Sequence, residues 1–168
     1  MTTTLDDDLL LERQLCFALS VASRSVVGAY RPVLEQLDLT HPQYLVMLAL
    51  WEESPRTVRD VGRALAMESA TLSPMLKRLE TQGLITRTRV PGNERALAVG
   101  LTQAGRDLRS AARRVPATMM ERLGLTREQV ETLNDTMHAI IRATGTELPG
   151  PPRPSGDAAR TTPGENPR

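Results

Sequence analysis

The fold is decided by residues 69–101, which read SATLSPMLKRLETQGLITRTRVPGNERALAVGL. Leu72, Leu76 and Leu79 are spaced four and three residues apart, so they share one face of a helix. After Gly83, apolar and polar residues alternate with a period of two on both sides of a Pro-Gly-Asn turn, which is typical of a β-hairpin. The stretch therefore predicts a helix followed by a two-stranded hairpin with a basic tip.

Two serines are candidates for the start of this helix. Ser73 is followed by Pro74 and is the better N-cap on local grounds. The apolar face favours the earlier start at Ser69, because that face begins with Leu72.

Apolar stripes predict further helices on both sides of this stretch. The long ones are expected over about residues 8–29, 102–120 and 126–144, the first being interrupted by Pro32. Two more helices follow Thr40 and Thr57, which are typical N-caps. The residues expected to face inward are Leu15, Leu19, Ala22 and Val26; Tyr44, Met47, Leu48 and Trp51; Val58, Val61 and Leu65; Ala104, Leu108, Ala111 and Val115; and Val130, Leu133, Met137 and Ile140.

A helix, a short helix, another helix and a hairpin within about fifty residues form the arrangement of a winged helix-turn-helix. The predicted fold class is therefore mainly α with a small β-hairpin. Four parts are expected: N-terminal helices over 1–54, the winged module over 55–102, C-terminal helices over 103–146, and a disordered Pro-rich tail over 147–168. The terminal helices have apolar stripes without an evident partner, so we expect them to form the interface of a homodimer.

The formal net charge of +1 conceals a basic centre. Residues 56–114 contain twelve basic and five acidic residues, whereas residues 1–55 contain three basic and eight acidic ones. Such a block is either a solvated arginine-rich face or a surface that binds phosphates. The small hydroxyl and apolar side chains at the start of the 69–81 helix suit close approach to base edges, and this favours double-stranded DNA.

The residues expected to contact DNA lie on the 69–81 helix and in the hairpin. On the helix they are Ser69, Thr71, Ser73, Pro74, Met75, Lys77 and Arg78. In the hairpin, whose tip suits the minor groove, they are Arg87, Arg89, Asn93 and Arg95.

The composition argues against several other classes of protein. One cysteine and two histidines leave no expected metal site, no disulfide framework and no cofactor. No apolar run reaches about 18 residues, and the acidic N-terminus does not resemble a signal peptide, so we expect a cytoplasmic protein without a membrane partner. All four aromatic residues precede residue 52, which disfavours a stacking platform for single strands.

Several motifs carry a family resemblance that covers about residues 10–145. The runs TLSPMLKRLE (71–80), GLITR (83–87), NER (93–95) and LTQAG (101–105) resemble the multiple-antibiotic-resistance regulator (MarR) family of dimeric winged-helix repressors. The runs LCFAL (15–19), YRP (30–32) and PQYLVM (42–47) resemble its organic hydroperoxide resistance repressor (OhrR) branch. One position departs from the family pattern: Asn93 stands where the wing usually has an aspartate, so the brace on Arg95 is at best a neutral hydrogen bond.

Cys16 has two interpretations. On its own, a cysteine on an apolar helix is usually an inert core residue, and Arg13 is the only cation nearby in the sequence. The resemblance implies instead that organic hydroperoxides oxidise Cys16 to a sulfenic acid and that the repressor then leaves its operator. Tyr30 is fourteen residues away, about 21 Å along one helix, so it can reach Cys16 only from a second subunit. Family members do use tyrosines of the opposing subunit in this way.

His41 stands where the resemblance implies a second tyrosine. We hypothesise that His41 helps to activate the thiol; the alternative is a position at a helix start that faces water. The chain has no second cysteine, so it looks like the one-cysteine type. Oxidised Cys16 would then need an external low-molecular-weight thiol, would condense with a backbone nitrogen, or would over-oxidise irreversibly.

The sequence thus predicts a homodimeric repressor that binds a palindromic operator, senses organic hydroperoxides and is not an enzyme. The first alternative is a MarR-type repressor that responds to a non-covalent aromatic or phenolic ligand, with Cys16 structural. The second is a thiol peroxidase, which the missing resolving cysteine and the lack of an acid–base pair disfavour.

Overall fold

The structure is a computed structural model that describes residues 8–90 and 92–146. The tail predicted over 147–168 lies outside the described residues. The elements are η2 (Leu11–Arg13), α1 (Leu15–Leu34), η3 (Glu35–Leu37), α2 (His41–Glu52), β1 (Arg56–Thr57), α3 (Val58–Ala64), α4 (Ser69–Thr81), β2 (Ile85–Val90), β3 (Asn93–Leu101), α5 (Gln103–Ala112), α6 (Val115–Leu123) and α7 (Arg127–Ala143), where η marks a 3-10 helix.

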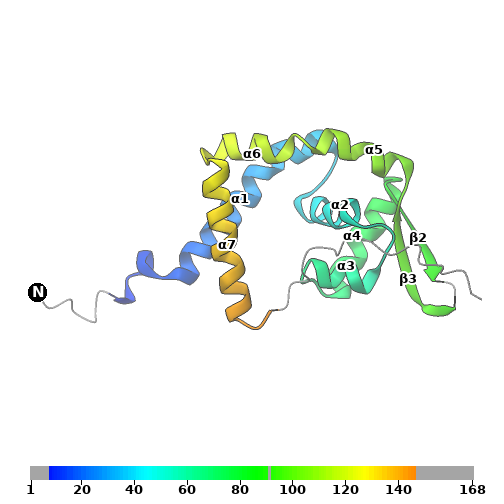
Figure 1. Cartoon of the computed structure of the whole chain (residues 1–168), viewed down its shortest axis with the longest axis horizontal. Helices are drawn as coiled ribbons and strands as arrows, with labels where there is room; N and C mark the ends of the chain where they lie inside the picture. The colour runs from blue at the N-terminus through cyan, green and yellow to red at the C-terminus, as the bar shows by residue number, and fades with distance from the viewer. Residues whose placement is uncertain (1–7, 91, 147–168) are drawn as a thin grey trace, which may run out of the picture.

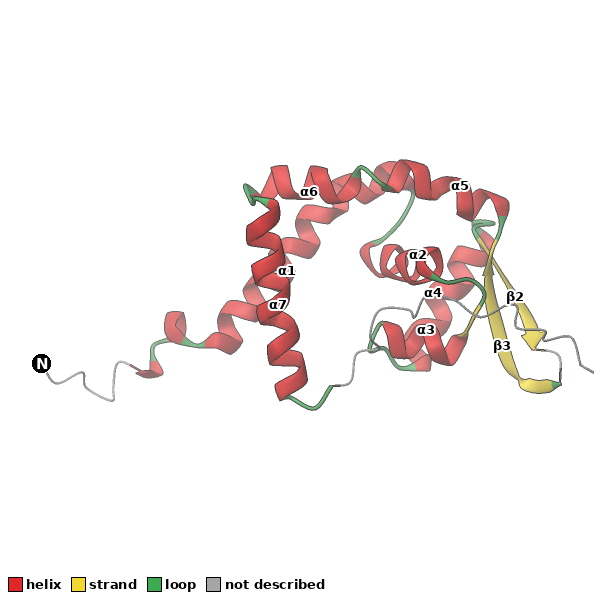
Figure 2. Ribbon diagram, in the orientation of Figure 1, coloured by secondary structure: helices red, strands yellow, loops and turns green. Residues whose placement is uncertain are grey.

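The elements gather at two ends of the molecule. Helices α3 and α4 and the hairpin lie together at one end, and α1, α6 and α7 lie at the other (Figure 1). Helix α2 lies between them and contacts α1, α3, α4 and α5, while α5 leads from the sheet back to α6 (Figure 2). The mainly helical fold with a small sheet, predicted as a winged helix-turn-helix, is confirmed.

The core forms where α2, α4 and the sheet meet. Leu72, Leu76 and Leu79 of α4 are fully buried, as their spacing predicted. They pack in one cluster with residues of α1, α2, β2 and β3, including Leu34, Met47, Leu50, Ile85 and Val99. Burying one face of α4 in this way leaves its opposite face outward.

The sheet has a third strand that the sequence did not reveal. Its order is β1-β3-β2, and both pairs are antiparallel. Strand β1 has only two residues, Arg56 and Thr57, which pair with Val99 and Ala98. So short a segment has no periodicity to detect, and it is a strand only because it pairs with the edge of β3 that β2 leaves free.

Local signals placed most helix starts correctly. Thr40 and Thr126 form capping boxes with Gln43 and Gln129, and Thr57 caps α3. Helix α4 begins at Ser69, as its buried face favoured, but its N-cap position is Glu68, whose side chain makes no capping bond. The hydroxyl of Ser73 instead donates to the carbonyl of Ser69 within the helix (2.8 Å).

Two predicted helices have other bounds in the structure, and each contains a proline whose effect the sequence did not settle. Helix α1 starts at Leu15, after a 3-10 turn, and continues through Pro32 to Leu34. The loss of one backbone donor near the helix end is tolerated because the next residues, Val33 and Leu34, are buried in the core. The helix predicted over 102–120 is split into α5 and α6, with Pro116 in the first turn of α6.

The split also changes which residues of this segment face inward. Gly105 and Ala112 are buried in α5, whereas Ala104 and Ala111, predicted to face the core, are exposed. Val115 is buried as expected. Leu108 packs against the core as predicted, so the prediction failed only for the two alanines of α5.

The terminal helices keep apolar residues exposed within the single chain. Leu15 is 60% exposed, Phe17 38% and Leu133 47%, and α7 has no buried residue. The described part of the same chain therefore covers the stripes predicted on these helices only in part. Among residues 8–90 and 92–146, no helix combines the length and apolar character needed to cross a membrane.

Replacement of Gly105 tests the tightest packing point. A Cβ at Gly105 would overlap the carbonyl oxygen of Leu84, and the carbonyl of Gly105 accepts a buried hydrogen bond from Trp51 Nε1 (2.8 Å). We expect Gly105→Ala to lower the free energy of unfolding by about 1–3 kcal/mol, because the backbone must shift. Chemical denaturation measures this. In the control Gly100→Ala, the new methyl meets only ordinary contacts at 3.5 Å or more, and little change is expected.

Candidate DNA interface and cysteine site

The outward face of α4 presents most of the residues predicted to bind DNA. Ser69, Thr71, Ser73 and Pro74 are exposed at its start, and Lys77 and Arg78 are exposed in the turns that follow. Met75 is only partly exposed. The hydroxyl and basic groups on this face are thus more accessible than Met75.

The two strand arginines differ in their surroundings. Arg89 is exposed on β2, whereas Arg87 is partly buried and donates from Nε to Glu80 Oε2 of α4 at 3.0 Å, with a second, shorter bond from Nη2. This paired hydrogen bond holds the pKa of Glu80 below its ordinary value. Arg87 therefore fixes the hairpin to α4. The side chains of Asn93 and Arg95 lie outside the described residues.

Cys16 lies in the first turn of α1 as an exposed free thiol. Tyr30 lies near the other end of the same helix, about 21 Å away at 1.5 Å per residue. Within one chain the helix therefore keeps Tyr30 apart from Cys16.

The structure does bring Tyr30 and His41 together. Their rings meet edge to face, with centroids 5.4 Å apart, and Tyr30 also contacts Tyr44 at 6.2 Å. His41 is the first residue of α2 and is partly buried against Tyr30 rather than turned fully to water. The aromatic and imidazole groups thus form one cluster where α1 meets α2.

Burial shifts the pKa values of the groups in this cluster. Desolvation raises the pKa of Tyr30. The pKa of Tyr44 is raised first by desolvation and second by its electrostatic interaction with Tyr30. Desolvation lowers the pKa of His41 below its ordinary value of 6.5, which favours the neutral imidazole. A neutral imidazole can donate one hydrogen bond, and this is the form in which His41 would help to activate the thiol.

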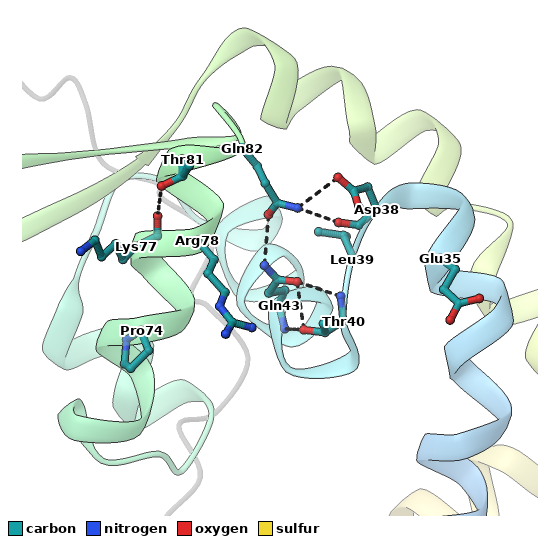
Figure 3. Close-up of a pocket in the computed structure, with 10 residues that line it drawn as sticks. All are labelled: Glu35, Asp38, Leu39, Thr40, Gln43, Pro74, Lys77, Arg78, Thr81 and Gln82. Atoms are coloured by element: carbon teal, nitrogen blue, oxygen red, sulfur yellow. Dashed lines mark hydrogen bonds between the residues drawn. The ribbon is translucent and has the colours of Figure 1, made fainter.

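Sequence reasoning missed a chain of polar contacts beside α4. Gln82, which follows α4, donates to the carbonyl and the carboxylate of Asp38 and accepts from the buried Gln43 (Figure 3). These residues border a hollow of about 640 Å³ between η3, the start of α2 and the outer side of α4. The Thr40-x-x-Gln43 capping signature could have pointed to Gln43, but nothing local points to Gln82.

The described part of the chain offers no cluster of three or more His, Cys, Asp or Glu side chains that could hold a metal ion.

Comparison with known proteins gives this geometry a context. The chain is 43% identical over 134 residues to the organic hydroperoxide resistance transcriptional regulator of Bacillus subtilis strain 168, an alignment that covers 80% of this chain and 89% of the relative. The model of the MarR family matches residues 39–97. The chain belongs to the MarR family.

Other similar proteins agree with this assignment. The HTH-type transcriptional regulator TtmR of Methylorubrum extorquens strain PA1 is 40% identical over 151 residues, which cover 86% of this chain and 76% of the relative. A solved structure of reduced AbfR bound to DNA has a TM-score of 0.70 and 32% identity, and the match covers 84% of this chain and 99% of AbfR. The chain is a DNA-binding transcriptional regulator of the MarR family, and the proteins named here are transcriptional regulators rather than enzymes.

The exposed cations of α4 give this MarR-family regulator a testable DNA surface. We expect Arg78→Ala to weaken DNA binding severalfold and to reduce the slope of log affinity against log salt by about 0.9 for each phosphate that the arginine neutralises. Fluorescence anisotropy at several salt concentrations measures both. Arg127→Ala removes the same charge from the exposed start of α7 and should change neither quantity. Equal behaviour of the two variants would remove Arg78 from the interface.

The lowered pKa of His41 predicts acid sensitivity. Between its unfolded pKa of about 6.5 and its lower folded value, the unfolded state binds the proton first, so stability falls as the pH drops through this window. We expect the wild type to lose more unfolding free energy between pH 7.5 and pH 5.5 than His41→Gln. Urea denaturation at fixed protein concentration measures the loss of unfolding free energy in each protein. Both proteins have the same carboxylates, so the contribution of those groups cancels when the two losses are compared. Equal losses would contradict the burial of His41.

Proposed function

We propose that this MarR-family regulator is a homodimeric repressor that senses organic hydroperoxides by oxidation of Cys16 and then releases its operator. The observation that carries the proposal is the exposed thiol of Cys16 in the first turn of α1, where a peroxide can reach it. The 43% identity to an organic hydroperoxide resistance regulator supports the same sensing chemistry.

Dimerisation would complete the sensing site. The apolar residues left exposed on α1 and α7 support an interface between two copies. If two α1 helices cross antiparallel about a two-fold axis, Tyr30 and His41 of one subunit approach Cys16 of the other. The terminal segments 1–54 and 103–146 would then form the dimer and sensing part, and residues 55–102 the DNA-binding module.

The chemistry needs only the peroxide as oxidant. The Cys16 thiolate attacks one peroxide oxygen, an S–O bond forms as the O–O bond breaks, and the departing alkoxide takes up a proton to leave as an alcohol. The product is a sulfenic acid. The chain has a single cysteine, so an external low-molecular-weight thiol must reduce it, by forming a mixed disulfide with loss of water that a second thiol then cleaves.

Oxidation would act on DNA through geometry. Two α4 helices would occupy successive major grooves of a palindromic duplex, about 34–36 Å apart. A polar oxygen added to Cys16 beside the dimer junction would shift the two modules relative to one another, and one of them would then leave its groove. A switch from nearly full to nearly empty operators requires the two states to differ by about 5 kcal/mol in DNA affinity.

The deciding experiment uses Cys16→Ser. We expect the wild type to release a fluorescent operator duplex on addition of cumene hydroperoxide and to rebind it after treatment with a small thiol. We expect Cys16→Ser to bind with wild-type affinity and to ignore the peroxide. Fluorescence anisotropy follows the release, and mass spectrometry reports the oxygen added to Cys16.

The same variant distinguishes the alternative function. A Cys16→Ser protein that still released DNA on addition of peroxide would exclude Cys16 as the sensor. Release by an aromatic or phenolic compound from both proteins, with no response to peroxide, would favour a non-covalent ligand and a structural Cys16.

A further inference from the structure

A set of directional contacts fixes the end of α4 to the junction of α1 and α2, and we call Asp38, Gln43 and Gln82 the polar clasp. Gln43 Nε2 donates to Gln82 Oε1 at 3.0 Å. Gln82 Nε2 donates to the backbone carbonyl of Asp38 at 2.8 Å and to its carboxylate at 3.3 Å. The clasp thus joins segments 39 and 44 residues apart in sequence.

The requirement for an amide at position 43 goes beyond helix capping. Gln43 Oε1 already accepts from Thr40 N at 2.8 Å and from the Thr40 hydroxyl at 2.9 Å, and a glutamate would accept these bonds equally well. Only an amide can also donate to Gln82. Gln43 is 4% exposed, so its amino group depends on that acceptor.

The other two residues of the clasp, Gln82 and Asp38, are each held by their own backbone. Gln82 is the C-cap residue of α4, and its own N–H bonds to the carbonyl of Arg78, so it moves with the helix. Asp38 adopts a left-handed conformation (φ 53°) at the end of η3, where its N–H bonds to the carbonyl of Glu35. The contacts therefore link two well-defined backbones.

The clasp supplies what the apolar core lacks. Leu72, Leu76 and Leu79 bury one face of α4, and Arg87 ties its flank to the hairpin, but apolar contacts are not directional and select the angle between α4 and the α1–α2 junction less sharply than hydrogen bonds do. Hydrogen bonds at its end fix its angle. For a helix about 20 Å long, a rotation of about 5° moves the far end by about 2 Å, and that end carries Ser69 and Thr71.

We propose that Gln82, held by Gln43 and Asp38, is a positioning residue that sets the angle of α4 and hence the spacing of operator half-sites that a dimer accepts. The proposal rests on the proposed roles of α4 as the reading helix and of the dimer. It does not depend on peroxide sensing. Gln82 itself contacts no base in this role.

The test measures spacing discrimination by the reduced full-length protein. A palindromic duplex selected from a random library is compared with versions that carry one base pair more or one fewer between the half-sites. We expect the wild type to bind the selected duplex best. Gln82→Met keeps the length of the side chain but removes its hydrogen bonds. We expect it to reduce severalfold the ratio of the Kd for each duplex of altered spacing to the Kd for the selected duplex.

Further variants separate the parts of the clasp from its surroundings. Gln43→Glu keeps the capping acceptor but removes the donor to Gln82, and it should also lower the ratio. Gln36→Met makes the matched change on the exposed surface of η3 and should leave the ratio unchanged. Circular dichroism at the assay temperature confirms folding, and whichever of Gln82→Met or Gln43→Glu is folded carries the test.

The outcomes are distinct. An unchanged ratio in the folded clasp variants, or an equal loss of affinity on all duplexes, overturns the positioning role. Arg78→Ala should weaken binding to all three duplexes in equal proportion. If Arg78→Ala and Lys77→Ala bind every duplex as tightly as the wild type, α4 is not the reading helix and the proposed function fails instead.

Discussion

Burial of the three leucines of α4 is the constraint on which the rest of the structure depends. Leu72, Leu76 and Leu79 are shielded by α2 and the sheet, so a helix of thirteen residues has a fixed inside and a fixed outside. The outside carries the small hydroxyls and the cations, while Glu80 on the flank holds Arg87 of the wing. The paired hydrogen bond between Arg87 and Glu80 makes α4 and the hairpin one rigid unit. Such rigidity is needed if α4 and the hairpin are to fit neighbouring grooves of DNA at the same time.

Helix α2 connects this unit to the proposed sensing end. Its first residue, His41, packs on Tyr30, its third residue, Gln43, joins the polar clasp, and Trp51 in its last turn bonds to the start of α5. The proposed sensing end and the unit of α4 and the hairpin thus both contact one helix, α2, and are not connected by a loop alone. A displacement of the start of α2 would reach the ring cluster and the end of α4 together, since His41 and Gln43 are only two positions apart.

The sequence was informative where the information is local. Leucine spacing, threonine caps and the alternation after Gly83 placed α4, the hairpin and most helix starts. Strand β1 was missed because two residues carry no period, and the break after Ala112 was missed because a proline is compatible with the first turn of a new helix. At the candidate site, exposure of the α4 cations could be predicted. The Arg87–Glu80 pair and the polar clasp could not, because they depend on how segments up to 44 residues apart approach one another.

Trp51 gives the molecule a built-in optical reporter. It is the only tryptophan in the chain, is 8% exposed, and lies beside Tyr44 with ring centroids 6.4 Å apart. Its indole N–H donates to the carbonyl of Gly105, so the emitting ring connects α2, which carries His41 and Tyr44, to α5, which follows the hairpin. Any rearrangement that separates these helices breaks that bond and alters the polarity around the ring. Its emission wavelength therefore follows the motion of the two parts without an attached dye.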